Sequence, residues 1–192
     1  MQMLKRPTKD QLAAASGQII PDIIAPDLKV LFCGINPGLY TAFTGHNFAR
    51  PGNRFWPALH AAGFTPRQFR PEEDEMLLEL GYGITNIVDR ATGNAAELSS
   101  VELIEGGINL VEKVIEYQPQ VLALLGISAY RVAFGKASAV VGLQEQAIGD
   151  TKLWVLPNPS GLNAHFPPKE LHKVYKKLRV YVDETADQGG LD

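Results

Sequence analysis

The stretch VLFCGINPG at residues 30–38 predicts a buried strand followed by a tight turn. Its first four residues form a continuous apolar run, which is typical of a strand covered on both faces of a parallel sheet. The stretch LWVLPNPSGL at residues 153–162 repeats this plan. Loops that leave parallel strands gather at the carboxyl edge of an open sheet, where ligands bind. We therefore expect the turns at 36–38 and 158–162 to form two sides of one site.

Strands and helices alternate along the rest of the chain. Apolar runs predict strands at about 28–35, 83–88, 121–125 and 153–156, and helices are predicted over 54–62, from 71, from 99 to 118, over 128–134 and from 168. This alternation indicates the α/β fold class, with a mostly parallel central sheet in a three-layer α/β/α domain. We expect the domain to span residues 28–182. Residues 1–27 are expected to form an N-terminal arm with one packed segment, and residues 183–192 a flexible tail.

Local signals refine the expected helices. Ser99 and Glu102 form a capping box at the start of the helix that ends before Pro119. The apolar residues of this helix lie on one stripe, at positions 104, 108, 111 and 115. The last helix is expected to face the core through Leu171, Val174, Leu178 and Val182. The acidic run 72–75 complements the dipole of a helix that begins near position 71, so we assign this run a structural role only.

Length and composition indicate one globular domain. The chain has 192 residues, of which 45% are hydrophobic and 20% are charged. No apolar stretch approaches the ~20 residues that span a bilayer, and the N-terminus lacks the apolar run of a signal peptide. The single cysteine, Cys33, lies in a predicted buried strand, which excludes a disulfide framework. We expect a monomer without membrane association in the cytoplasm, located at the nucleoid if its partner is DNA.

The net charge of −3 argues against a protein that coats nucleic acids non-specifically. Neutralisation of phosphates supplies most of the non-specific affinity for nucleic acids. Basic residues nevertheless cluster after each of the two turns. Arg50 and Arg54 follow the first turn, and Lys169 and Lys173 follow the second. We expect these four side chains to contact phosphates if the partner is DNA.

Familiar cofactor and metal motifs are missing. The sequence contains no GxxxxGK[ST] and no GxGxxG after a strand, so nucleotide-binding functions are weakly supported. HExxH and GxSxG are also absent, and the four histidines have no spacing that would make a ligand pair. We expect neither a cofactor nor a metal ion.

The motifs around the first turn occur in a characteristic order. The turn GINPG at 34–38 is followed by TGHNF at 44–48 and PGNRFW at 51–56. Further along come GITNIVDR at 83–90, YQP at 117–119 and NPSGL at 158–162. This series resembles the mismatch-specific uracil/thymine-DNA glycosylase branch of the uracil-DNA glycosylase superfamily, over about residues 28–180. The resemblance implies a uracil-DNA glycosylase-like fold and an enzyme that rotates a damaged base out of the duplex.

The resemblance implies roles for residues around the base. Asn36 would hold the attacking water by orientation, since an amide is no base near neutral pH. Phe48 would stack on the flipped pyrimidine, and Asn86 would hydrogen-bond its edge. Thr41 would lie on the C5 side of the base, and Gly38 belongs to the same base-binding loop. Each has a structural alternative: a turn residue for Asn36, a core ring for Phe48, and a solvated strand end for Asn86.

The second turn resembles the segment that enters the DNA. Leu162 would fill the gap that the flipped base leaves, as apolar wedges do at unstacked steps. Gly161 and Asn163 would contact the widowed guanine, and Asn158 and Ser160 belong to the same loop.

Asp89 is the one acid that could change the mechanism. It follows a predicted strand, beside Arg90, so it could reach the same edge as Asn36 and supply a general base. The alternative is that Asp89 and Arg90 stabilise a loop or the start of a helix.

These observations lead to a functional hypothesis. We expect a monofunctional glycosylase that hydrolyses the N-glycosidic bond of uracil, preferably opposite guanine, in double-stranded DNA and so initiates base excision repair. No lysine occurs in the matching loops, which argues against a Schiff-base intermediate. Thr41 would crowd a thymine methyl group, which favours uracil over thymine. Two alternatives remain open: a mismatch- or damage-binding protein without catalysis, and a hydrolase of small nucleosides.

Overall fold

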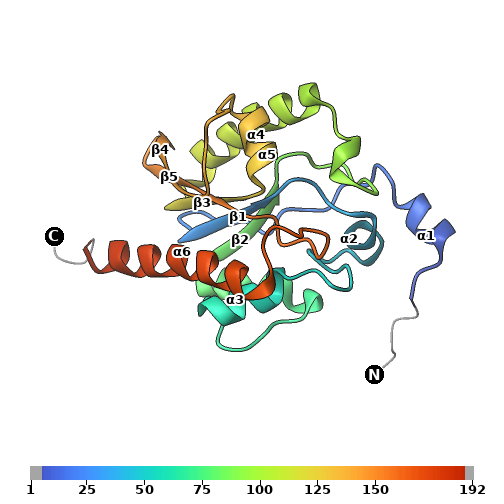
Figure 1. Ribbon diagram of the computed structural model, residues 1–192, viewed down its shortest axis with the longest axis horizontal. Helices are drawn as coiled ribbons and strands as arrows, with labels where there is room; N and C mark the ends of the chain where they lie inside the picture. Colours follow the sequence, from blue (N-terminus) through green and yellow to red (C-terminus); the bar gives the residue numbers. More distant parts are fainter. Residues whose placement is uncertain (1–5, 189–192) are drawn as a thin grey trace.

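A five-stranded sheet forms the centre of the computed structural model, which describes residues 6–188 (Figure 1). The strands are β1 (Val30–Gly34), β2 (Tyr82–Asn86), β3 (Val121–Leu125), β4 (Gly142–Ile148) and β5 (Thr151–Leu156). They lie in the order β2-β1-β3-β5-β4. Strands β2, β1, β3 and β5 run parallel, and β4 is antiparallel to β5. The predicted α/β class with a mostly parallel sheet is therefore confirmed.

Helices cover both faces of the sheet. Helices α3 (Phe55–Ala62) and α6 (Pro168–Gln188) lie on one face, and α4 (Ser100–Tyr117) and α5 (Ile127–Ala133) lie on the other (Figure 1). Alternate side chains of β1 divide between the two layers, because successive residues of a strand point to opposite faces. Phe32 packs with Phe55 of α3, whereas Leu31 packs with Leu110 of α4. The expected three-layer arrangement is thus present, with one apolar core on each side of the sheet.

Some short elements were not expected. Helix α1 (Lys9–Ala14) lies in the N-terminal segment, and α2 (Leu39–Thr44) lies within the predicted loop 36–53. The segment that begins at Pro71 is a 3-10 helix, η1 (Pro71–Leu80), and a second short 3-10 helix is η2 (Ala95–Glu97). No helix among residues 6–188 is long and apolar enough to cross a membrane.

Helix α4 begins at the predicted capping box, but its apolar stripe does not face the core. The Ser99 side chain accepts a hydrogen bond from the Glu102 backbone N–H, as expected. Gly106 and Gly107 turn inward, where an added Cβ would lie 2.2 Å from the Ile87 carbonyl oxygen and 2.7 Å from that of Ala133. The helix therefore uses its smallest residues for the closest approach, and the stripe at 104, 108 and 115 points into solvent.

The two ends of the expected domain extend further than the sequence suggested. Ile23 forms a bridge with Ile84 of β2, and Asp22 forms an ion pair with Lys113 of α4 at 2.5 Å. Residues before position 28 therefore contact the sheet and its α4 layer. At the other end, α6 continues past Val182 to Gln188. The rest of the expected tail, residues 189–192, lies outside the described residues.

Candidate active site

The carboxyl ends of the parallel strands surround a cavity of about 390 Å³. The turn at 36–38 and the loop at 158–163 both line it, so the two segments meet as expected. Amide side chains dominate the lining, which includes Asn36, Asn47, Asn53, Asn86, Asn94, Asn158 and Asn163. Arg50 is the only charged residue that lines the cavity within the described part of the chain. The site therefore offers hydrogen-bond donors and acceptors rather than acids and bases.

The amide of Asn36 has a defined orientation. Its Nδ2 donates to the Arg90 carbonyl oxygen at 3.0 Å and to Thr92 Oγ1 at 2.8 Å. The Thr92 hydroxyl donates its own proton to the Asn94 carbonyl oxygen at 2.9 Å, so it can only accept from Asn36. Both Nδ2 protons are thus used, and Asn36 Oδ1 is left as an acceptor at the edge of the cavity.

Phe48 lines the cavity in an unusual backbone conformation. Its φ is 54°, in the left-handed region that a bulky residue rarely adopts. One face of its ring stacks on Phe55, with centroids 4.0 Å apart and an interplanar angle of 26°. Because this residue also lines the cavity, the opposite face of the ring is the one that a flat ligand could cover.

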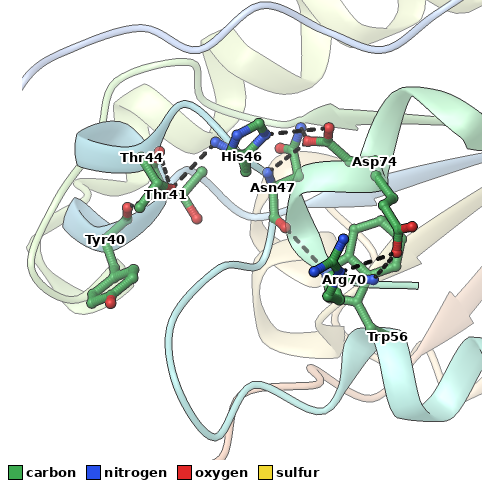
Figure 2. Close-up of polar contacts among 9 residues, drawn as sticks. Tyr40, Thr41, Thr44, His46, Asn47, Trp56, Arg70 and Asp74 are labelled. Atoms are coloured by element: carbon green, nitrogen blue, oxygen red, sulfur yellow. Dashed lines mark hydrogen bonds and ion pairs between the residues drawn. The ribbon is translucent and has the colours of Figure 1, made fainter. Parts of the chain in front are cut away.

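A buried carboxylate holds the segment before Phe48 (Figure 2). Asp74 Oδ2 accepts from the Asn47 backbone N–H at 2.9 Å and from Asn47 Nδ2 at 3.3 Å. His46 Nδ1 lies 3.5 Å from Asp74 Oδ1, and Trp56 Nε1 donates to the Asn47 carbonyl oxygen at 3.1 Å. Asp74 therefore has more than the helix-dipole role that we assigned to the acidic run. Sequence reasoning missed it because its partner lies 27 positions away.

Asn86 and Gly34 lie opposite each other at the ends of β2 and β1. A Cβ at Gly34 would lie only 2.5 Å from Asn86 Oδ1 and 3.7 Å from Phe48 Cζ. Glycine at this position thus allows the Asn86 amide to lie against the end of β1, beside the Phe48 ring. Thr41 and Gly38 also line the cavity, from α2 and its N-cap. The structure therefore brings together the residues predicted to surround a base.

The loop at 158–163 is held by its own side chains. Asn158 Oδ1 accepts from the Ser160 backbone N–H at 2.8 Å, and Asn163 Nδ2 donates to the Asn158 carbonyl oxygen at 3.0 Å. An added Cβ at Gly161 would lie 2.6 Å from the Gly52 carbonyl oxygen. Leu162 is 72% exposed at the edge of the cavity. The only large apolar residue of this loop therefore projects into solvent.

Arg54, which we expected to contact phosphates, forms its hydrogen bonds within the protein. Its guanidinium donates to the carbonyl oxygens of Phe166 at 2.7 Å and Asn163 at 3.0 Å, and also to that of Ser160. Its backbone N–H donates to the Pro159 carbonyl oxygen at 2.9 Å. A part-buried guanidinium with three carbonyl partners has few donors left for DNA. Arg54 instead positions the loop at 158–166 against the start of α3.

The other predicted phosphate contacts lie at the surface. Arg50 is exposed at the edge of the cavity. Lys169 and Lys173 are exposed near the start of α6, and Lys173 forms an ion pair with Glu170 at 2.7 Å. Arg50 lies beside Leu162, since both line a small hollow at the edge of the loop, whereas Lys173 is already paired with a carboxylate.

Asp89 is not among the residues that line the Asn36 cavity. It lines a separate hollow of about 220 Å³, together with Glu105 and Lys113. Its neighbour Arg90 forms an ion pair with Glu102 at 2.6 Å, and this hydrogen bond holds the pKa of Glu102 at about 2. The loop that carries Asp89 therefore contributes the Arg90 backbone to the Asn36 site and not the Asp89 carboxylate.

The fold and the cavity together define a class of protein. It is a three-layer α/β protein whose site lies at the carboxyl edge of a mostly parallel sheet and consists of amides, one aromatic ring and an exposed apolar loop. Among residues 6–188 no group of three or more His, Cys, Asp or Glu side chains could hold a metal ion.

Comparison with known proteins identifies the family. A model of the Uracil DNA glycosylase superfamily matches residues 21–179, so the chain belongs to that superfamily. Its fold is similar to the solution NMR structure of a candidate uracil DNA glycosylase from Methanosarcina acetivorans, with a TM-score of 0.57 and 17% sequence identity. The match covers 85% of this chain and 98% of that one. Membership of the superfamily supports a DNA glycosylase activity.

Proposed function

We propose that this chain is a monofunctional glycosylase of the mismatch-specific branch, which hydrolyses the N-glycosidic bond of uracil in double-stranded DNA, preferably opposite guanine. One observation carries the proposal. A single cavity combines an oriented amide acceptor at Asn36, a ring at Phe48 and a second amide at Asn86, with the exposed Leu162 at its edge. Such a set suits a flipped base, which needs stacking, edge recognition and a positioned water.

Recognition of the base would involve three residues. The uracil ring would stack on the face of Phe48 that Phe55 does not cover. The Asn86 amide can donate to a uracil carbonyl and accept from N3–H, which is complementary to that edge. Thr41, buried in α2, would crowd a methyl group at C5 and so favour uracil over thymine. Gly38 begins the same helix and leaves room for the base beside it.

Hydrolysis would depend on the orientation of the attacking water rather than on a general base. Asn36 Oδ1 would accept a hydrogen bond from a water and aim its oxygen at C1′ of the deoxyribose. The water oxygen forms a bond to C1′ as the bond from C1′ to uracil N1 breaks, and the bonding pair leaves on the uracil anion. The attacking water then loses a proton to solvent. Because Asp89 lines another hollow, we assign no part of this step to its carboxylate.

The loop at 158–163 would replace the flipped nucleotide in the stack. Leu162 would enter the gap, where an apolar side chain compensates part of the few kcal/mol lost on unstacking. Gly161 and Asn163 would face the widowed guanine, with Asn158 and Ser160 supporting the turn by the hydrogen bond between them. Arg50, Lys169 and Lys173 would contact phosphates around this position.

A gel assay tests the proposal directly. A labelled duplex with one uracil opposite guanine is incubated with the protein and analysed before and after alkali. We expect an intact strand before alkali and a nick at the uracil position after it, with free uracil released. Matched duplexes with uracil opposite adenine and thymine opposite guanine should react more slowly. Binding without base release would indicate a damage-binding protein, and cleavage of free deoxyuridine at a similar rate would indicate a nucleoside hydrolase.

A further inference from the structure

Helix α4 exposes a row of aliphatic side chains that the fold does not use. Val101, Ile104, Ile108 and Ile115 are 61%, 45%, 57% and 59% exposed, and Val111 between them is partly buried. These five positions are separated by three, four, three and four residues, which is the spacing of a coiled-coil seam. We call this row the α4 seam. It is about 21 Å long, because it runs from position 101 to 115 of α4 at a rise of about 1.5 Å per residue.

The inner face of α4 explains why the seam is not part of the core. Gly106, Gly107, Leu110 and Val114 are the buried residues of the helix, and they complete its contact with the sheet and α5. The seam lies on a different side of the helix, so its removal from water needs another molecule. Contiguous exposed apolar surface of this kind marks interaction sites in soluble proteins.

Carboxylates run beside the seam. Four seam residues are followed directly by glutamate, in the pairs Val101-Glu102, Ile104-Glu105, Val111-Glu112 and Ile115-Glu116, and Glu102 is already paired with Arg90. Because successive helix residues are about 100° apart, these glutamates form a parallel row along one flank. Glu105, Glu112 and Glu116 are exposed, and within residues 6–188 none of them forms an ion pair.

The seam ends at a second hollow, at the amino edge of the sheet. Ile115 lines this cavity of about 490 Å³ together with Ile148, and the exposed carboxylates of Asp27 and Asp150 also line it. The exposed Lys152 lines the hollow as well, so the hollow continues the apolar strip of the seam and carries two carboxylates and one lysine. It could receive a long side chain with an apolar stem and a cationic end.

We propose that the α4 seam is the docking surface for an amphipathic helix of a partner protein, with aliphatic residues at seam spacing and Lys or Arg along one flank. The basic flank would pair with Glu105, Glu112 and Glu116 while the two apolar rows pack together. Two α4 seams from two copies of this chain fit each other less well, because each supplies only the same carboxylates and leaves them without counter-charges.

The docking surface is separate from the DNA site. None of the seam residues lines the Asn36 cavity, which lies at the carboxyl edge of the sheet. The seam lies on α4, in the layer on the far side of the sheet from α3 and α6 (Figure 1). A partner helix on α4 and a duplex at the cavity can therefore bind at the same time.

A pair of synthetic peptides tests the proposal. Both carry leucine at the seam positions of four heptads, one with lysine and the other with glutamate along the flanks. Fluorescence anisotropy with the full chain should detect binding of the lysine peptide and not of the glutamate peptide. The double variant Ile104→Ser/Ile108→Ser should weaken this binding at least tenfold, and Glu105→Gln/Glu112→Gln should weaken it and reduce its salt dependence. Val180→Ser, at a 44% exposed aliphatic residue of α6, is the matched control and should bind normally.

Several outcomes would overturn the proposal. Equal binding of the lysine peptide to wild type and to Ile104→Ser/Ile108→Ser would show general attraction to an acidic protein. Sedimentation that shows a dimer, abolished by the same double variant, would identify a second copy as the occupant. A melting temperature lowered by Ile104→Ser/Ile108→Ser as much as by a core substitution would mean that the seam serves the fold. Uracil excision by the double variant should equal that of the wild type, because neither isoleucine lines the cavity.

Discussion

At the scale of single residues, the role that we propose for the Asn36 amide depends on its orientation. Its two Nδ2 protons are held by Arg90 and Thr92, so Oδ1 alone can accept from a water. Asn36→Ala should leave folding and duplex binding nearly unchanged, because the proposed interaction belongs to the transition state. The single-turnover excision rate should fall by about 10²-fold, as expected when a reacting group loses its position. Rapid-quench measurements with the uracil·guanine duplex check this.

Asp89→Asn is the control for this experiment. Asp89 lines a different hollow, so its substitution should change the rate less than twofold or so. A larger loss at Asp89 than at Asn36, with the fold intact, would make Asp89 the general base and remove the orientation mechanism. The pH dependence of the rate is a second check, since only an acidic base produces a rise through its own pKa.

Thr92 should matter although it was not predicted as a site residue. Thr92→Val removes the acceptor of one Asn36 Nδ2 proton. An N–H left unpaired in this way costs about 1–3 kcal/mol of free energy. The Asn36 amide would then lose its defined direction, and we expect about a tenfold lower single-turnover rate with unchanged duplex affinity. Thr92→Ser keeps the hydroxyl and should retain the wild-type rate. Equal loss in both variants would point to packing of the methyl group instead.

Leu162 should be needed only when a base must leave a stack. Leu162→Ala is expected to slow excision from a paired duplex several-fold more than from a single strand, because only the duplex has a gap to fill. The residue is 72% exposed, so the melting temperature should not change. The comparison uses the same uracil oligonucleotide with and without its complement. An equal loss on both substrates would assign Leu162 to support of the loop.

The sequence predicted many of the residues around the cavity and missed those that hold them in place. Asn36, Phe48 and Asn86 were assigned because the motifs that carry them, GINPG, TGHNF and GITNIVDR, resemble those of the glycosylase branch. The hydrogen-bond partners of Asp74 and Arg54 were not predicted because they lie far away in sequence, 27 positions for Asp74 and more than a hundred for Arg54. A charge pattern shows which residues are basic or acidic, but it does not show whether folding already supplies their partners.

At the scale of elements, Arg54 joins the start of α3 to the loop that carries Leu162. Arg54→Met should release this loop, because three backbone carbonyls lose their donor. We expect at least a tenfold loss of excision from the duplex, whereas the slope of log affinity against log salt should stay the same. Arg50→Met is the comparison, and it should reduce that slope by about 0.9, the value for one phosphate contact. A reduced slope for Arg54→Met would restore Arg54 as a phosphate contact.

The elements that sequence patterns did not reveal are short, polar or outward-facing. Strand β4 has the sequence GLQEQAI, whose polar residues suit the edge of a sheet and hide the signal of a strand. Helix α2 has only six residues and lies between two glycines, Gly38 and Gly45. In α4 the apolar spacing indicated a helix correctly, but periodicity alone does not reveal which face is buried. Gly106 and Gly107 lie on the buried face, because only residues without a Cβ allow the close approach there.

At the scale of the whole molecule, acid should destabilise the fold through two partly buried carboxylates near the surface. The Arg67 guanidinium and the Arg70 backbone N–H hold the pKa of Glu73 at about 2, and Arg90 and Ser99 do the same for Glu102. Because both folded-state pKa values lie below the ordinary value of 4.5, the stabilisation is present above pH 4.5. It should be lost as the pH falls towards 2. Urea unfolding at a series of pH values between 5 and 2.5 measures this loss.

The double variant Glu73→Gln/Glu102→Gln should reduce the dependence of the free energy of unfolding on pH, since neither amide titrates. Salt should also reduce the effect in the wild type, because both ion pairs are at the surface. Identical pH profiles for the variant and the wild type would place the acid-sensitive groups elsewhere in the chain.

The contacts of Arg54 and the close approach of Gly161 to Gly52 join the opposite walls of the cavity. Walls joined in this way restrict closure of the loop at 158–163 on a ligand, and in the proposed function the duplex would supply the movement instead. The activation free energy of excision then includes the free energy needed to open the base pair. Wobble and mismatched pairs open at lower cost than well-stacked Watson–Crick pairs. A rigid protein would thus gain selectivity from the stability of each base pair. A stable pair opens less often, so its base reaches the pocket less often.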